Sequence, residues 1–246
     1  MKNMAQTTEQ LASRVPRPKV VPFKGSFNFR YAERTIHQAL VQKLARLVSC
    51  LHATRLLMEA GFVQEQAALQ RILDEIAEDI SFLSWSVINN ETTPLHEAYL
   101  SAFYLEEFDS DSEVTSSSDR PMIHRKKIRA YLDRAISGPK GSSRNLDAAR
   151  TVSKAYSGYV HAASPQIMDM YSGNPPRFHM HGMRGTTRHL EHRADFWNYM
   201  YRGICAFCIS AKAFGDEELF KDIRQFNDEF VRQTGNDLQS NEWPEI

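Results

Sequence analysis

Four of the chain's nine histidines lie within one stretch of sixteen residues, RFHMHGMRGTTRHLEH, residues 177–192. His179 and His181 are two residues apart. His189 and His192 are three apart, a spacing that puts two side chains on one face of a helix. Imidazole nitrogens bind zinc and similar divalent metals. We predict no cofactor, and zinc or another divalent metal held by these four histidines is the alternative.

Arginines in the same stretch favour an anion over a cation. Residues 177–193 contain four arginines and one glutamate, a formal charge of about +3, which would repel a divalent cation. The stretch leads into an expected helix, and the first turn of a helix attracts phosphate and carboxylate groups. We therefore predict that Arg184 and Arg188 hold an anion. An ordinary basic surface loop is the alternative.

A second group of candidate residues lies near AYSGYVH, residues 155–161. At 100° per residue, Arg150, Lys154, Ser157 and His161 form one stripe along a helix. Arg150 and Lys154 could bind a phosphate, and the His161 imidazole is a group of the kind that moves a proton in acid–base catalysis. The alternative is that His161 stabilises the carboxyl end of its helix. His189 is the second candidate acid or base.

Carboxylates near the apolar face of another helix predict a polar network. Asp79 lies about 60° and Glu75 about 100° from the centre of that face. A half-buried carboxylate needs a partner, and Arg71, Tyr156 or His161 could supply it. Such a network could orient or tune the acid–base residue, because perturbed carboxylates are common at functional sites.

Cysteine usage and hydropathy indicate a protein of the cytoplasm. Three cysteines, an odd number, argue against a disulfide framework. Cys205 and Cys208 form a CAFC sequence inside an expected helix, where small buried side chains are the better interpretation than a redox pair. The amino-terminal residues do not resemble a secretory signal, and no apolar run is long enough to span a membrane.

Most of the chain shows the spacing of amphipathic helices. Apolar residues recur every three or four positions, and no segment alternates convincingly with a period of two. We expect one all-α bundle of six to seven helices, with an irregular loop rich in Pro, Gly and His before the penultimate helix. The expected helices span about 29–60, 63–88, 95–107, 121–136, 144–161, a short turn within 166–171, 190–214 and 217–232.

The expected bundle domain covers residues 25–234. Residues 1–24 contain three prolines and little helical pattern, so we expect a poorly ordered tail. Residues 108–119 belong to an acidic, serine-rich segment that we expect to be a mobile loop. A basic segment, residues 120–154, follows it and carries ten Lys or Arg against two Asp. Residues 235–246 form a second tail.

Two segments resemble known proteins. HATRLLMEAGFVQEQAALQRILDEIAEDISFL (52–83) and AYSGYVH (155–161) resemble a family of uncharacterised bacterial helical proteins, and more distantly the HEPN-type superfamily. That resemblance implies a helical dimer acting in stress or phage defence, with metal-independent RNA cleavage as the first activity to test. Its hallmark is Arg followed after four to six residues by His. Three pairs match it, Arg30 with His37, Arg46 with His52, and Arg184 with His189, and the last has the best context, where a loop enters a helix. His161 has no arginine at that spacing, which puts cleavage in doubt.

The main hypothesis is a cytoplasmic homodimer, not bound to a membrane, that binds a phosphate-bearing ligand, a nucleotide or RNA. The site would lie near His161 and residues 177–192. Two alternatives stay open: a metal-binding protein using the histidine cluster, and a structural or protein-interaction module without a small-molecule site.

Overall fold

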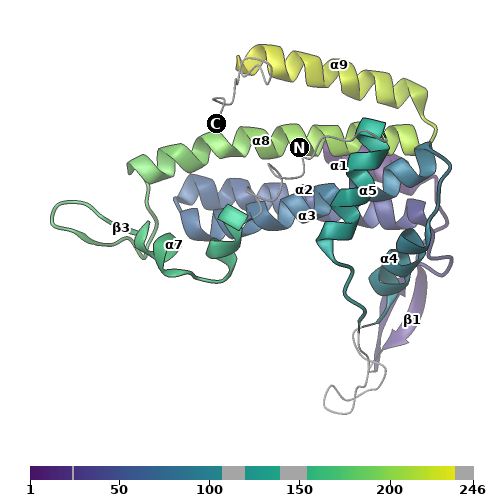
Figure 1. The fold of residues 1–246 in the computed structure, drawn as a ribbon, viewed down its shortest axis with the longest axis horizontal. Coiled ribbons are helices and arrows are strands. Elements are labelled where there is room, and N and C mark those ends of the chain that lie inside the picture. Colours follow the sequence, from purple (N-terminus) through teal and green to yellow (C-terminus); the bar gives the residue numbers. More distant parts are fainter. Residues whose placement is uncertain (24, 107–119, 139–153, 236–246) are drawn as a thin grey trace.

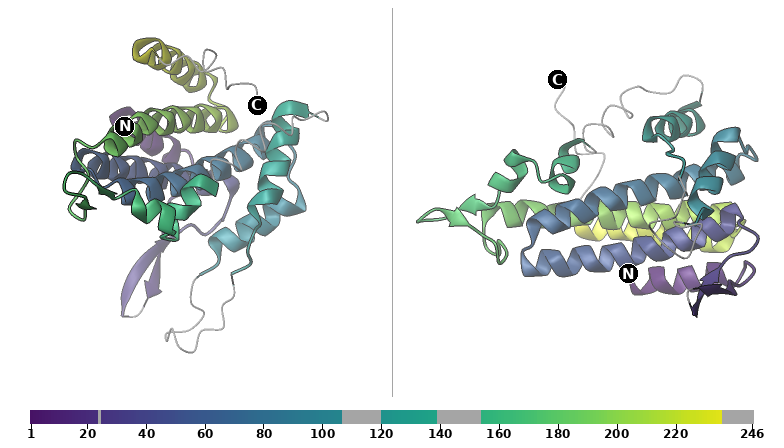
Figure 2. Two further views of the ribbon diagram at one scale, coloured as in Figure 1. Left: turned by 60° about the vertical axis from the view of Figure 1, so that its left-hand side comes forward. Right: turned by 90° about the horizontal axis from the view of Figure 1, so that it is seen from below.

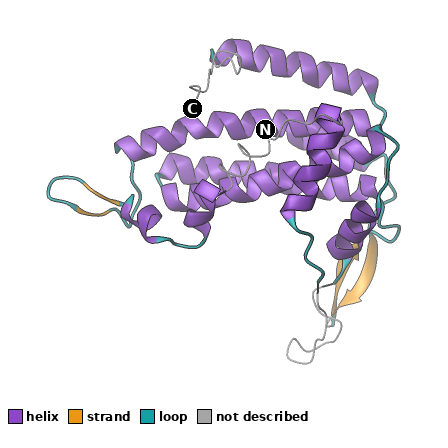
Figure 3. Ribbon diagram, viewed as in Figure 1, coloured by secondary structure: helices purple, strands orange, loops and turns teal. Residues whose placement is uncertain are grey.

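Helices dominate the computed structural model, which describes residues 1–23, 25–106, 120–138 and 154–235. This confirms the all-α class (Figure 3). Three long helices lie side by side, α2 (Ile36–Ala60), α3 (Val63–Ile88) and α8 (Thr187–Ala213) (Figures 1 and 2). No helix in the described ranges is both long and apolar enough to cross a membrane.

Helices α2 and α3 form an antiparallel hairpin. The Thr35 side chain accepts a hydrogen bond from the Gln38 main-chain nitrogen, and the Gln38 side chain accepts one in return, so a capping box starts α2. Gly61 ends α2 with φ of 82°, a left-handed conformation that costs glycine little. The spacing of apolar residues in α2 buries Leu40, Leu44, Leu47 and Leu51.

Helix α8 runs parallel to α3 and antiparallel to α2. Gln66 donates to the main-chain oxygen of His192, and Asp74 pairs with Arg202 about two to three turns further along both helices. His189 and His37 contact main-chain oxygens near opposite ends of the α2–α8 pair. Most of the buried apolar residues form one core cluster that draws on these three long helices and on shorter helices around them.

Shorter helices cover this layer. α1 (Lys2–Ala12) packs on α2 and α8, and α9 (Glu217–Thr234) packs on α8. α4 (Pro94–Tyr104) contacts α2, and α5 (Arg125–Ser137) contacts α3. Residues 154–160 are helical and lead to the short α7 (Ser164–Met168).

The expectation of a poorly ordered tail over residues 1–24 is wrong. Met4, Thr8 and Leu11 are spaced four and three apart and form the buried face of α1. Arg14 then pairs with Asp216 at 2.9 Å and fixes the end of this segment. Residues 19–23 form strand β1 (Lys19–Phe23). The three prolines follow or interrupt these elements and do not prevent them.

The described residues also contain two short pairs of strands that the sequence did not predict. β1 pairs antiparallel with β2 (Ser26–Arg30), and β3 (Tyr171–Ser172) pairs with β4 (Arg177–Phe178). Residues 26–30 alternate polar and aromatic side chains and so form a strand. The helix that was expected from about residue 29 therefore begins at Ile36.

The remaining helix boundaries differ from expectation by a few residues. The expected helix 95–107 is α4, which ends at Tyr104, and the basic helix begins at Arg125 instead of near 121. The short turn is α7, Ser164–Met168. The acidic loop 108–119, the first ten residues of the expected helix 144–161, and residues 236–246 lie outside the described residues.

Candidate functional site

The histidine-rich stretch is fixed to the turn between α2 and α3. The Met183 main-chain nitrogen donates to the Gly61 oxygen at 2.7 Å, and the Met183 side chain is buried. A side-chain carbon at Gly61 would lie 2.6 Å from the Arg184 main-chain nitrogen. A side-chain carbon at Gly182 would lie equally close to the Ala60 oxygen. Two glycines therefore let the chain approach this turn.

Helix α8 begins directly after this contact and buries two of the four histidines. The Thr186 side chain caps the helix by accepting from the His189 main-chain nitrogen at 3.2 Å. The His189 Nε2 atom lies 2.7 Å from the Met58 oxygen, and the residue is 6% exposed. His189, a candidate acid or base, is thus engaged with the main chain in the interior.

His192 lies at the centre of a polar network. Its Nε2 atom is 3.4 Å from the Tyr159 hydroxyl, and its Nδ1 atom is 3.7 Å from the Asp195 carboxylate. The Tyr159 ring meets the imidazole edge to face at 5.6 Å. Burial disfavours the charged imidazole and lowers the pKa of His192, although Asp195 opposes that shift.

Two tyrosine hydroxyls bridge the 154–160 helix to acidic residues. Tyr159 donates to Asp169 at 2.9 Å, and Tyr156 donates to Asp195 at 2.8 Å. Burial and the neighbouring carboxylates raise the pKa of both tyrosines, so they stay protonated donors. Tyr156, expected beside the α3 carboxylates, belongs to this network.

The four candidate metal ligands occupy different surroundings. The His179 Nε2 atom lies 3.0 Å from the Ser172 hydroxyl, and His181 is exposed. His189 and His192 are buried with the partners given above. Across the described residues, no three His, Cys, Asp or Glu side chains are grouped in a way that could hold a metal ion.

The expected anion-binding residues are not gathered around one point. Arg150 lies outside the described residues. Lys154 and Arg184 are exposed. Arg188 pairs with Asp169 at 2.7 Å and with Glu191 at 2.8 Å, so two carboxylates already balance its charge.

The expected network on α3 is present with other partners. Arg71 pairs with Glu75 at 2.7 Å, as the four-residue spacing predicted. Asp79 is 2% exposed at its side chain and binds Lys43 of α2 at 2.7 Å and Arg125 of α5. The sequence missed both partners, although the cation-rich segment before residue 136 was a signal that α5 could supply one.

His161 does not join that network. It is exposed just after the 154–160 helix, where its main-chain nitrogen donates to the Ser157 oxygen. Among the described residues, no hydrogen bond, ion pair or ring contact joins His161 to Glu75, Asp79 or His189. The proposed pairing of His161 with the α3 carboxylates is therefore not formed in this structure.

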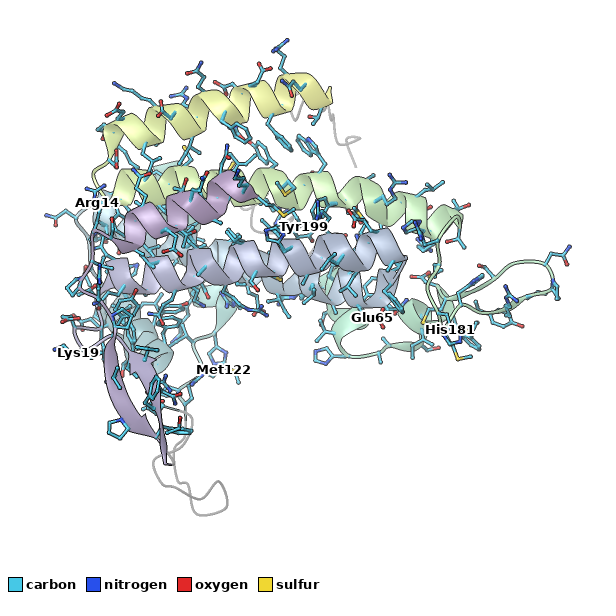
Figure 4. The ribbon with its side chains drawn as sticks, turned by 180° about the vertical axis from the view of Figure 1, so that it is seen from behind. Arg14, Lys19, Glu65, Met122, His181 and Tyr199 are labelled. Atoms are coloured by element: carbon cyan, nitrogen blue, oxygen red, sulfur yellow. The ribbon has the colours of Figure 1, made fainter. Side chains whose placement is uncertain are left out.

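The exposed surface around the histidines combines basic and apolar side chains. We call residues 171–193 the basic arm. It includes the β3–β4 hairpin, which extends beyond the ends of α2 and α3 (Figures 1 and 4). His181 lies where the hairpin returns to the bundle (Figure 4). Besides the ion-paired Arg188, the exposed cationic and apolar residues of the arm are Arg177, Arg184, Arg193, Tyr171, Phe178, Met180 and Leu190.

Comparison with known proteins gives no family for this chain. No protein-family description matches it, and no curated protein or solved structure matches it significantly.

Proposed function

We propose that the basic arm binds single-stranded RNA. The observation that carries the proposal is the pairing of exposed rings with unpaired cations on one projecting element. Tyr171 and Phe178 are both exposed, and their ring centroids lie 4.8 Å apart. Arg177 lies next to Phe178 in β4. Proteins that bind single strands stack bases on aromatic rings and hold the backbone with cations.

Charge on the arm favours this ligand. Arg177, Arg184 and Arg193 are exposed, and no ion pair involving them occurs in the described part of the chain. The nearby acids Asp169 and Glu191 are both bound by Arg188. Three cationic side chains are therefore available to phosphate groups, whose counterions they would release.

The polar network behind the arm supports it mechanically. Arg188, at the start of α8, holds Asp169, which also accepts from Tyr159 of the 154–160 helix. Met183 fixes the same segment to the α2–α3 turn. These contacts hold the arm against the bundle, which lowers the entropy cost of ordering the arm around a ligand.

We confine the proposal to binding. The resemblance to HEPN-type proteins supports RNA as the ligand, and its hallmark would make Arg184 and His189 a cleavage pair. The His189 imidazole, however, is buried against the Met58 oxygen while Arg184 faces solvent. A general acid or base must reach the proton that it transfers, and His189 is 6% exposed with its Nε2 atom held by the Met58 oxygen. A homodimer stays a prediction.

Fluorescence anisotropy with a labelled single-stranded RNA of about twelve nucleotides tests the proposal. Binding is measured across roughly 50 to 200 mM salt. The Arg177→Ala, Arg184→Ala double variant should bind more weakly and reduce the slope of log K against log salt by about 1.4, since each lost phosphate contact contributes about 0.7. Phe178→Ala should lose about ten-fold in affinity with the slope unchanged.

Arg17→Ala is the matched control. Arg17 is an exposed arginine for which no ion pair occurs among the described residues, and it lies two residues before Lys19, which Figure 4 shows at the opposite end of the molecule from His181. Its replacement should leave both affinity and salt slope unchanged. Failure of the wild-type protein to bind, or equal slopes in the double variant and the wild type, would contradict the proposal.

A further inference from the structure

A cavity lies near the start of α2, at the end of that helix away from the basic arm. Its volume is about 360 Å³, and it opens where the end of β2, the turn before α2 and the end of α4 meet. In Figure 1 the β1–β2 hairpin and α4 stand at the end of the bundle opposite the β3–β4 hairpin. Its charged lining residues are Arg30, Arg34, Arg120 and Glu106. We call it the arginine pocket.

The arginine pocket has an excess of positive charge. Arg30 donates two hydrogen bonds to Glu106, at 2.6 and 2.9 Å, and this contact lowers the pKa of the Glu106 carboxyl. The Glu106 carboxylate thus balances Arg30. Arg120 is also engaged, since it donates to the Leu105 oxygen at 3.0 Å. Arg34 adds a further positive charge to the lining, and the pocket therefore suits an anionic ligand.

Arg34 is the lining arginine whose guanidinium could bind such a ligand directly. Among the described residues it makes no hydrogen bond or ion pair, although its charge acts on Glu106 and Tyr104. Its φ of 56° lies in the left-handed region, which costs an arginine about 1 kcal/mol. Residues held in such conformations often serve a binding site.

Aromatic rings complete the lining. Tyr31, Phe103 and Tyr104 face the cavity, and the Phe103 and Tyr104 rings lie 4.9 Å apart. The Tyr104 hydroxyl donates to the Thr35 oxygen at 2.8 Å, which fixes that ring. Burial raises the pKa of Tyr104, so it carries no negative charge that would repel an anion.

We propose that the arginine pocket binds a small aryl phosphomonoester. A phosphomonoester is anionic at neutral pH and carries oxygens that accept strong hydrogen bonds, and Arg34 supplies a cationic donor for them. Arginine binds phosphate with paired hydrogen bonds, and Arg34 has its fork free to do so. An aromatic ring on the ligand can pack against Phe103 and Tyr104. A cavity of this size holds one small ligand.

Isothermal titration calorimetry with phenyl phosphate and with inorganic phosphate tests this site. Phenyl phosphate should bind with one-to-one stoichiometry and about ten-fold more tightly than inorganic phosphate, because the ring adds contacts with the aromatic lining. No saturable binding of phenyl phosphate, or equal affinities for the two probes, would overturn the proposal.

Arg34→Gly separates binding from folding. Glycine accepts the left-handed backbone, so the variant should unfold at the same or a higher temperature than the wild type. It should nevertheless lose phenyl phosphate binding by about ten-fold or more, since a charge-assisted hydrogen bond is removed. A folded Arg34→Gly protein with wild-type affinity would overturn the proposal.

The same variants distinguish a failure of this proposal from a failure of the RNA proposal. The Arg177→Ala, Arg184→Ala variant of the basic arm should bind phenyl phosphate like the wild type, because those residues lie beyond the other end of α2. Loss of phenyl phosphate binding in that variant would place the ligand on the arm and overturn the assignment to the arginine pocket.

Discussion

Asp79 is the residue on which the ion pairs between α2, α3 and α5 converge. Its carboxylate is buried, and it binds Lys43 and Arg125. In Asp79→Ala these two cations would lose their common partner. Removing one member of a buried ion pair costs about 3 kcal/mol or more. Urea denaturation should show a loss of this size in the free energy of unfolding.

Glu59→Ala is the comparison for Asp79→Ala. Glu59 pairs with Arg55 at 3.7 Å, and both side chains are about half exposed. An exposed pair contributes about 0.5 kcal/mol or less. Equal losses in the two variants would show that burial of Asp79 does not make its ion pairs important.

His192 should make the folded protein sensitive to acid. Burial lowers its pKa in the folded state below the ordinary value of about 6.5. The unfolded chain therefore takes up a proton at a higher pH than the folded one, and stability falls as the pH drops below about 6.5. His192→Gln should flatten this part of the pH profile in urea denaturation. An unchanged profile would contradict the assignment.

Asp74 should act in the opposite direction. Its burial, only partly offset by Arg202, raises its pKa from 3.8 to about 6. The folded state therefore binds a proton that the unfolded state has released, and stability falls as pH rises from about 4 to about 6. The change is about 3 kcal/mol at most. In Asp74→Asn that decrease should be absent, and its persistence would mean that another group causes it.

At the residue scale, the sequence locates polar side chains but not their partners. The helical angle of Asp79 predicted a carboxylate close to the apolar face, and the spacing of Arg71 and Glu75 predicted their pair. Lys43 and Arg125 lie 36 and 46 residues from Asp79. Which cation reaches such a carboxylate depends on how helices pack, and that information is not in the local spacing.

The turn between α2 and α3 is the element that holds the basic arm. In Gly61→Ala, the new methyl group would require a left-handed alanine and would collide with the Arg184 main chain. The two effects together should cost about 2–3 kcal/mol. Urea denaturation measures the loss, and hydrogen exchange should show faster exchange at the Met183 main-chain nitrogen, which donates to Gly61.

Gly215→Ala is the matched control for Gly61→Ala. Gly215 has φ of 67°, but nothing lies within 4 Å of an added side-chain carbon. This variant should cost only the conformational part, about 1 kcal/mol. It should leave exchange at Met183 unchanged. Similar effects of the two substitutions would indicate that the contact between the turn and the arm contributes nothing.

Long helices were predictable at the element scale, and short exposed elements were not. Helices of more than twenty residues repeat their apolar spacing often enough to be recognised, as α2, α3 and α8 do. β1 and β2 have five residues each, and almost all of them are exposed, so the burial that normally marks one face of a strand is lacking. α1 was missed because only Met4, Thr8 and Leu11 mark its face.

At the scale of the whole molecule, the two proposed sites lie at opposite ends of α2. Arg34 precedes the first residue of that helix, and Gly61 with its bound Met183 follows the last. A helix of 25 residues is about 37 Å long. The sequence had centred the candidate ligand site on the histidine-rich end, since no linear motif marks the arginine pocket, whose lining comes from five separate segments.

The proposal that the basic arm binds single-stranded RNA can be tested by locating bound RNA on the protein surface. Ultraviolet crosslinking of a 4-thiouridine RNA to the wild-type protein, followed by mass spectrometry of the crosslinked peptides, identifies the residues in contact. If the basic arm binds RNA, crosslinks should fall within residues 171–193, with Tyr171 and Phe178 foremost because their exposed rings would stack on bases. Crosslinks confined to α5, or to the arginine pocket, would contradict it.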